Sequence, residues 1–270
     1  MENITQRTGA RKIEDIPKEV LHLLNKGEIA TVNLVEWLAL DQSQLVENTF
    51  PALGLEALVA TLKAALQAQQ KPTALRSIKL VGEALFPYCQ AEGITQQVFE
   101  AMLAHPSDTV RCYACYLKAL DPILSLEEKL TQSLPLVADE HFGVREVVWL
   151  ALRPAIAENL AAAITLLSTW THNQDENIRR FTTEATRPRG VWCKHIDALK
   201  ENPALALPIL EPLKADTSKY VQDSVGNWLN DASKTQPNFV QELCAAWEKN
   251  APTKATQRII KKAKRTLAKQ

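Results

Sequence analysis

The sequence predicts an all-α fold, a HEAT-like repeat solenoid built from antiparallel helix pairs, and three observations support this. The 270 residues are 46% hydrophobic and 23% charged and include only 8 glycines, a composition that favours helices joined by short turns. A short motif recurs along the chain, and prolines separate its copies. We expect one continuous repeat domain over residues 1–270, with a concave face lined by one helix of each pair.

Each repeat starts with an apolar residue followed by a polar one, usually Arg. The five starts are Leu75-Arg76, Val110-Arg111, Val144-Arg145, Ile178-Arg179 and Val221-Gln222. They lie 35, 34, 34 and 43 residues apart. This spacing fits two helices per unit, and units of this size must stack to bury their apolar faces.

Helix-terminating signals stand between the repeats. Asp108, Asp175 and Glu176 precede or open helices, where an acid is favoured, and Ser218 is a candidate cap. Prolines are expected to end helices between the units. These are Pro106, Pro122, Pro135, Pro154, Pro188, Pro203 and Pro237.

Charge is balanced overall but uneven along the chain, with 31 basic and 31 acidic residues. The segment 27–61 contains acids and no Lys or Arg, whereas the residues from Lys254 to Gln270 contain bases and no acid. We expect a basic helix at about 254–270. A solvated helix end and a phosphate-contacting helix both explain this tail.

The cysteines argue for a reducing compartment, which we expect to be the cytoplasm. Five cysteines form no regular framework, and the N-terminus lacks the apolar core of a signal peptide. Cys112 and Cys115 form an isolated C-x-x-C without partner ligands at zinc spacing, so we expect no metal. No apolar run approaches the roughly 18 residues of a membrane span.

A polar stripe recurs at positions 2, 6 and 9 of three consecutive repeats, counting the apolar start as 0. It comprises Glu146, Leu150 and Arg153, then Arg180, Glu184 and Arg187, then Asp223, Asn227 and Asn230, with Asp231 adjacent. One such set is explained by a solvated helix face, but three in register favour a shared lining. Arginines hold phosphates and carboxylates stabilise a cation, so the lining suits a phosphate-bearing ligand on which positive charge develops.

Three tryptophans lie near this stripe. Trp149 and Trp228 fall within predicted helices beside apolar neighbours, which favours burial. Trp192 follows Pro188 in a predicted loop, and we expect it to be exposed.

The segment Arg180-Phe181-Thr182-Thr183-Glu184-Ala185-Thr186-Arg187-Pro188-Arg189-Gly190-Val191-Trp192 resembles a signature of the AlkC-type DNA alkylation repair glycosylases, a HEAT-like superfamily that also contains AlkD. Segments 24–39, 144–154 and 220–231 are also similar to that family. Gly190-Val191 stands where the family pattern has Leu-Pro, and Trp228 stands where it has His. Both departures lie near the expected lesion pocket and bear on its shape.

The resemblance implies excision of cationic N-alkylated bases, such as 3-methyladenine, from double-stranded DNA without a cofactor. It implies catalytic roles for Glu146, Glu184 and Asp231. The expected DNA contacts combine the motif, the stripe and the basic tail: Arg180, Arg187, Arg189, Trp192, Arg153, Lys261 and Lys262.

An alkylated purine already carries positive charge and leaves readily, so stabilising the sugar cation is the main catalytic task. Glu184 is the first choice for that carboxylate, with Glu146 as its partner, and Asp231 positions water or orients an arginine. Two alternatives stay open. A catalytically silent HEAT-like protein would bind unusual DNA without base release, and a protein-binding scaffold would have an apolar groove and binding that is insensitive to salt. We expect a monomer.

Overall fold

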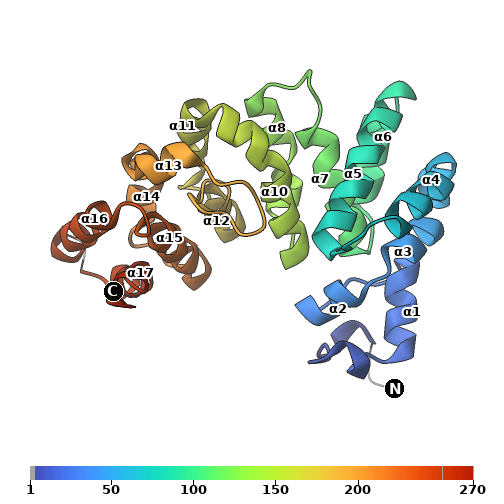
Figure 1. Ribbon diagram of the computed structural model, residues 1–270, viewed down its shortest axis with the longest axis horizontal. Helices are drawn as coiled ribbons and strands as arrows, with labels where there is room; N and C mark the ends of the chain where they lie inside the picture. Colours follow the sequence, from blue (N-terminus) through green and yellow to red (C-terminus); the bar gives the residue numbers. More distant parts are fainter. Residues whose placement is uncertain (1–3, 251, 270) are drawn as a thin grey trace. The chain divides into compact units, whose positions relative to one another are not determined.

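The computed structural model describes residues 4–250 and 252–269, which form helices and short 3-10 turns and no strand (Figure 1). The α-helices are α1 (Lys18–Lys26), α2 (Leu34–Ala39), α3 (Gln42–Thr49), α4 (Glu56–Gln67), α5 (Ala74–Ala91), α6 (Thr95–Leu103), α7 (Asp108–Ala119), α8 (Leu126–Gln132), α9 (Leu134–Val137), α10 (Phe142–Glu158), α11 (Leu160–Trp170), α12 (Glu176–Glu184), α13 (Asp197–Glu201), α14 (Leu207–Leu213), α15 (Lys219–Ala232), α16 (Pro237–Asn250) and α17 (Lys254–Ala263). The 3-10 turns are Ile4–Gln6, Ile13–Asp15, Pro51–Leu53, Pro203–Ala206 and Leu267–Lys269.

The chain divides into two compact units. One contains the described residues up to Leu124 together with Asp139–Ala151, and the other contains Ser125–Ala138 and the described residues from Leu152 onward. Helix α10 contributes its first part to the first unit and its last part to the second. The single repeat domain over residues 1–270 stays a prediction.

The repeat starts predicted from the sequence coincide with helices. Helices α5, α7, α10, α12 and α15 begin one or two residues before the five apolar starts. Asp175 accepts a hydrogen bond from the Asn177 N–H, and Ser218 accepts from the Tyr220 N–H, so both cap a helix as expected.

Arginine at the second position of the motif ties each helix to the turn before it. In Arg111, Arg145 and Arg179, Nη1 donates to the carbonyl oxygens five and six residues earlier, over 2.7 to 3.2 Å. Arg111 also binds Asp139 at 2.8 Å, and Arg179 binds Asp216 at 2.7 Å. We call these contacts the arginine ladder: each Arg–Asp pair joins one helix start to the next within one unit, and the contacts explain why the motif carries Arg beside its apolar residue.

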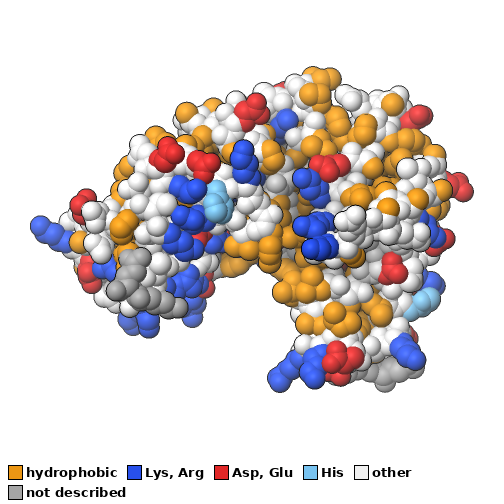
Figure 2. All heavy atoms as spheres, viewed as in Figure 1, with side chains coloured by type: hydrophobic (Ala, Val, Ile, Leu, Met, Phe, Trp, Pro, Cys, Tyr) orange, Lys and Arg blue, Asp and Glu red, His pale blue; other side chains and the backbone are white. Residues whose placement is uncertain are grey.

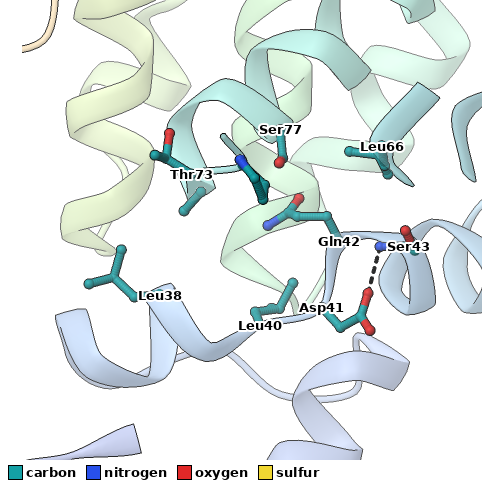
Figure 3. A pocket seen from close by; sticks show the side chains of 10 residues that line it. Leu38, Leu40, Asp41, Gln42, Ser43, Leu66, Thr73 and Ser77 are labelled. Carbon is teal, nitrogen blue, oxygen red and sulfur yellow. Dashed lines mark hydrogen bonds between the residues drawn. The ribbon is translucent and has the colours of Figure 1, made fainter. Parts of the chain in front are cut away.

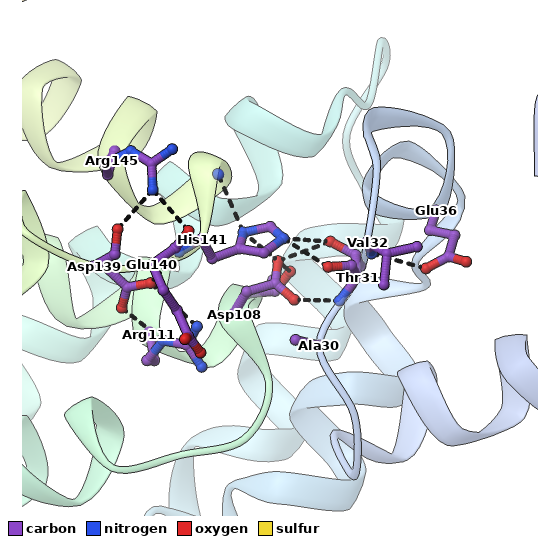
Figure 4. Close-up of polar contacts among 12 residues, drawn as sticks. Ala30, Thr31, Val32, Glu36, Asp108, Arg111, Asp139, Glu140, His141 and Arg145 are labelled. Atoms are coloured by element: carbon purple, nitrogen blue, oxygen red, sulfur yellow. Dashed lines mark hydrogen bonds and ion pairs between the residues drawn. The ribbon is translucent and has the colours of Figure 1, made fainter. Parts of the chain in front are cut away.

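A polar cluster joins the segment before α2 to α7 and α10 in the first unit (Figure 4). The Thr31 N–H donates to Asp108 Oδ1 at 2.8 Å, and the Gly143 N–H donates to His141 Nδ1 at 3.1 Å. Because Nδ1 of His141 accepts, Nε2 carries the hydrogen and donates to the Thr31 carbonyl oxygen at 2.8 Å. Asp108, expected near a helix start, therefore also fixes a distant segment.

Helix α7 lies at the centre of the first unit, packed against α5 and α6, and all of its residues are buried. Cys112 and Cys115 both lie on it with no exposed surface. Burial raises the pKa of both thiols well above the usual value, so the thiolate form that metals require is disfavoured.

The prediction that Pro154 ends a helix is wrong, because Pro154 lies inside α10. Proline removes one hydrogen bond to the carbonyl four residues earlier but does not by itself stop a helix. Leu152 and Ile156 on either side of it are fully buried, and their packing keeps the helix continuous.

Candidate functional site

Four of the predicted site residues meet in the second unit, where α12 packs against α15: Arg180, Glu184, Arg187 and Asp231. Glu184 is the last residue of α12, Arg187 follows that helix closely, and Asp231 lies near the end of α15. Glu184 and Asp231 are each 3% exposed. Two acids so deeply buried require positive partners.

Arg187 supplies most of that charge. Its Nε and Nη2 donate to Asp231 Oδ2 at 2.8 and 2.6 Å, and its Nη1 lies 3.4 Å from Glu184 Oε2. Burial alone would lower the pKa of the Arg187 guanidinium, but the two carboxylates raise it above its usual value. Lys234 completes the group, with Nζ 2.9 Å from Asp231 Oδ1.

The two carboxylates are therefore held differently. Both oxygens of Asp231 are engaged by cations. Oε1 of Glu184 accepts from the Ser224 hydroxyl at 2.7 Å and lies 3.6 Å from Arg180 Nη2. Arg180 also stacks over the Tyr220 ring, with 4.3 Å from its guanidinium carbon to the ring centroid.

Arg153 is placed differently from the sequence prediction of a DNA contact. It is buried, and its guanidinium donates to the carbonyl oxygens of Ala185, Arg187 and Lys194, at 2.9, 2.5 and 3.1 Å. These bonds fasten the loop that follows α12. A guanidinium turned inward onto backbone carbonyls is not presented to a phosphate, so Arg153 supports the loop in this structure.

The loop after α12 carries the remaining motif residues. Arg189 is half-buried, and its Nε has no hydrogen-bond partner among the described residues. Trp192 is 76% exposed, as the sequence predicted, and its φ of 62° is unusual for a residue other than glycine. A Cβ at Gly190 would overlap the Cys193 thiol and lie 3.1 Å from the Arg153 guanidinium, so a larger residue there needs the Cys193 side chain to move.

Glu146 belongs to the first unit, on the first part of α10. It is half-buried, and its Oε2 accepts a hydrogen bond from Trp149 Nε1 at 2.9 Å. Trp149 is buried, as expected, and so is Trp228. The convergence of Glu146 with Glu184 and Asp231 stays a prediction.

The prediction that the stripe of the fifth repeat lines an open surface is wrong, because the C-terminal segment packs along it. Asp223 binds both Arg258 and Lys262 at 2.9 Å. Asn227 accepts from Arg265, and Asn230 accepts from Thr266. Apolar residues of α17 are buried against α15, which draws the polar stripe under the same helix.

The basic tail thus has inward and outward side chains. Lys262 pairs with Asp223, whereas Lys261 on the same helix is exposed. Lys and Arg side chains are prominent on the surface over α15 and α17 (Figure 2). Helix α17 begins at Lys254 and ends at Ala263, and a short turn rather than a continued helix follows.

A separate cavity of about 470 Å³ lies in the first unit (Figure 3). Its walls come from the α2–α3 connection, the end of α4 and the start of α5, and include Leu40, Gln42 and Ser77. None of the predicted site residues lines it.

Among the described residues, no helix has the length and apolar character to cross a bilayer.

The residues of the site that sequence reasoning missed are side chains that lie between helices. Ser224 and Thr183 lie at repeat positions 3 and 5, outside the stripe, and Lys234 follows α15. Their importance depends on how α12 meets α15, and residue spacing along one helix does not reveal it.

The fold and the site together define a class of protein: a helical-repeat protein in which buried carboxylates surround an arginine. The family model described as DNA alkylation repair enzyme matches residues 128–263, slightly more than half of the chain. The chain belongs to this family.

Comparison with individual proteins extends this result. The uncharacterized protein YhaZ of Bacillus subtilis is 43% identical over 119 residues, which are 44% of this chain and 33% of YhaZ. The Pseudomonas fluorescens alkylpurine DNA glycosylase AlkC, solved bound to DNA containing an abasic site analogue, matches with a TM-score of 0.66 and 22% identity. That match covers 97% of this chain and 66% of the AlkC chain.

Streptococcus mutans AlkD2 matches with a TM-score of 0.61 and 24% identity, over 78% of this chain and 97% of AlkD2. At these identities the solved structures show the shared fold, and the predicted helical-repeat fold is confirmed. The chain spans 33% of the length of YhaZ and 66% of that of AlkC.

Proposed function

We propose that this chain is a DNA glycosylase that excises cationic N-alkylated bases of the 3-methyladenine type from double-stranded DNA. The observation that carries the proposal is the buried Glu184–Arg187–Asp231 cluster in a member of the DNA alkylation repair enzyme family. The sequence similarity to AlkC-type glycosylases at Arg180–Trp192 and the helical-repeat fold point to the same reaction.

The chemistry asks little of the protein beyond charge and position. When the C1′–N bond breaks, its electron pair returns to the cationic base, which leaves neutral, and the sugar becomes an oxocarbenium ion. The carboxylate of Glu184 stabilises that ion and orients a water, whose oxygen bonds to C1′ while its proton passes to the carboxylate and from there to solvent. No redox step or cofactor enters this sequence.

Asp231 acts on Arg187 in this proposal. With both oxygens bound by Arg187 and Lys234, it holds the guanidinium in place, where Arg187 balances Glu184 and faces DNA phosphate. Glu146 is the second carboxylate that the sequence nominates. Arg180, Arg189, Trp192 and Lys261 are the proposed DNA contacts, and Arg153 supports the loop that carries Arg189 and Trp192.

A catalytically silent DNA-binding protein is the second candidate, and one observation favours it. Glu184 and Asp231 are almost completely buried and each is bound by protein partners, so the cluster also has the form of a purely structural ion network.

Release of free base from methylated DNA separates the two candidates. We expect the intact protein to release base and Glu184→Gln to lower single-turnover release by about 100-fold or more, because one transition-state charge contact is lost. Glu242→Gln, at an exposed position on α16, is the matched control and should keep full activity. Binding of methylated DNA with no release by the intact protein would establish the silent candidate.

A further inference from the structure

We infer that Ser224 is a positioning residue that fixes which oxygen of Glu184 faces the substrate, an inference that rests on the proposed function. Ser224 is 1% exposed and lies where α15 contacts α12. Its hydroxyl donates to Glu184 Oε1 at 2.7 Å. A carboxylate only accepts, so the hydrogen of Ser224 is committed to this bond.

Thr183 extends the contact. Its Oγ1 lies 2.6 Å from Ser224 Oγ. Because the Ser224 hydroxyl donates its hydrogen to Glu184, Thr183 is the donor when the two hydroxyls form a hydrogen bond. The same Thr183 hydroxyl lies 2.9 Å from the Arg180 carbonyl oxygen, which competes for its hydrogen. The hydroxyls thus stand in series behind one carboxylate oxygen.

The two oxygens of Glu184 consequently differ. Oε1 is held inside the contact between α12 and α15 by a short charge-assisted bond. Oε2 faces Arg187 Nη1 at 3.4 Å, beyond the usual N–H···O distance, and keeps lone-pair capacity. Oε2 is therefore the oxygen assigned to the sugar cation and its water.

The hydrogen bond made by Ser224 differs from the one that a buried serine in a helix commonly makes, which is to a carbonyl oxygen of its own helix. Ser233, also 1% exposed and at the end of α15, donates to the Asn230 carbonyl of its own helix at 2.9 Å. Ser224 instead reaches a carboxylate on another helix. The two serines form a matched pair, equal in burial and different in partner.

The test labels glutamate carboxyl carbons with ¹³C and identifies the Glu184 signal by its loss in Glu184→Gln. Ser224→Ala should shift the Glu184 signal, and Thr183→Val should shift it less in the same direction. Ser233→Ala should leave it in place. An unshifted Glu184 signal in a folded Ser224→Ala protein, verified by its thermal melt, overturns the inference.

Excision supplies the second readout. Ser224→Ala should slow single-turnover base release by about tenfold to a hundredfold while Kd for DNA stays within about twofold, because the carboxylate is misplaced and not lost. Unchanged release would overturn the positioning role. If the intact protein releases no base, the glycosylase proposal fails by itself, and the carboxyl signal still decides whether Ser224 orients Glu184.

Discussion

Arg187 connects two carboxylates that would otherwise repel each other in a buried site. It donates two hydrogen bonds to Asp231 and lies 3.4 Å from Glu184, so its planar fork serves both acids at once. Burial of such a set is stable only while every charge keeps its partner. Stability and function therefore depend on the same side chain.

Removing that side chain should be costly. We expect Arg187→Met to lower the free energy of unfolding by about 3–5 kcal/mol, because two buried carboxylates lose their shared cation. Arg187→Lys should fall between Arg187→Met and the natural protein, since Lys keeps the charge without the fork. Urea denaturation measures both. Arg11→Met, at an exposed position outside the repeat motif, is the control, and an equally small effect of Arg187→Met would show that the ion network does not contribute to stability.

Residue spacing predicted part of this site. The repeat positions put Glu184 and Arg187 three residues apart in the stripe, although α12 ends at Glu184, and the next repeat supplies Asp231 from α15. Arg153 occupies an equivalent stripe position, yet it turns inward because the loop after α12 leaves backbone carbonyls to be satisfied. A repeat pattern indicates the face of a residue, and the contacts of its side chain depend on the neighbouring chain.

At the scale of elements, α17 is held on α15 by apolar and ionic contacts together. Ile259 and Ala263 are fully buried, and Arg258 and Lys262 both bind Asp223. Burial raises the pKa of Asp223, but hydrogen bonds from Lys262 and Arg258 lower it more, so the pKa lies below its usual value.

The attachment of α17 should therefore weaken in acid. A carboxylate whose pKa is lowered by folding contributes stability above its unfolded pKa, about 3.9, and loses it as the pH falls through the lower folded value. We expect hydrogen-exchange protection of residues 254–263 to fall over that range. Asp223→Asn should reduce protection at neutral pH and abolish the acid step. Asp197→Asn, an exposed pair with Lys200, should do neither, and an acid step that survives Asp223→Asn would point to another group.

The helix starts could be predicted because the repeat motif is local. Whether a proline ends a helix could not be predicted in the same way. In the fifth repeat Gln222 replaces Arg and still donates to the carbonyl six residues earlier, that of Asp216, at 2.7 Å. The motif thus preserves a bond that belongs to the turn. Pro154 stays within α10 because of burial on either side, which depends on other segments.

At the scale of the whole molecule, 31 basic residues balance 31 acidic ones, so the net charge of the chain does not attract it to DNA. Any phosphate binding has to come from local groups. The fold and the family could be predicted from the repeats and the motif. The position of Glu146 relative to the second unit could not, because α10 is shared by the two units and its sequence alone does not show which residues it contacts.

DNA binding should accordingly depend steeply on salt. On the proposed function, the logarithm of the binding constant should fall by about 0.9 per phosphate contact for each tenfold rise in salt. Lys261→Gln should reduce that slope by about one. Lys79→Gln, an exposed position on α5, is the control. Titrations at several salt concentrations measure the slope, and binding that ignores salt would favour a protein-binding scaffold.

The arginine ladder has a consequence for how this chain can change. Successive repeat starts lie 34 and 34 residues apart and then 43, so the interval from Ile178 to Val221 holds nine extra residues (43 − 34). The ladder still closes across that interval, through Arg179 and Asp216. The same interval contains the loop after α12 and its Arg-Pro-Arg run. Because such contacts hold the start of each helix, the connection between two repeats can change in length during evolution without altering the spacing of the other repeats.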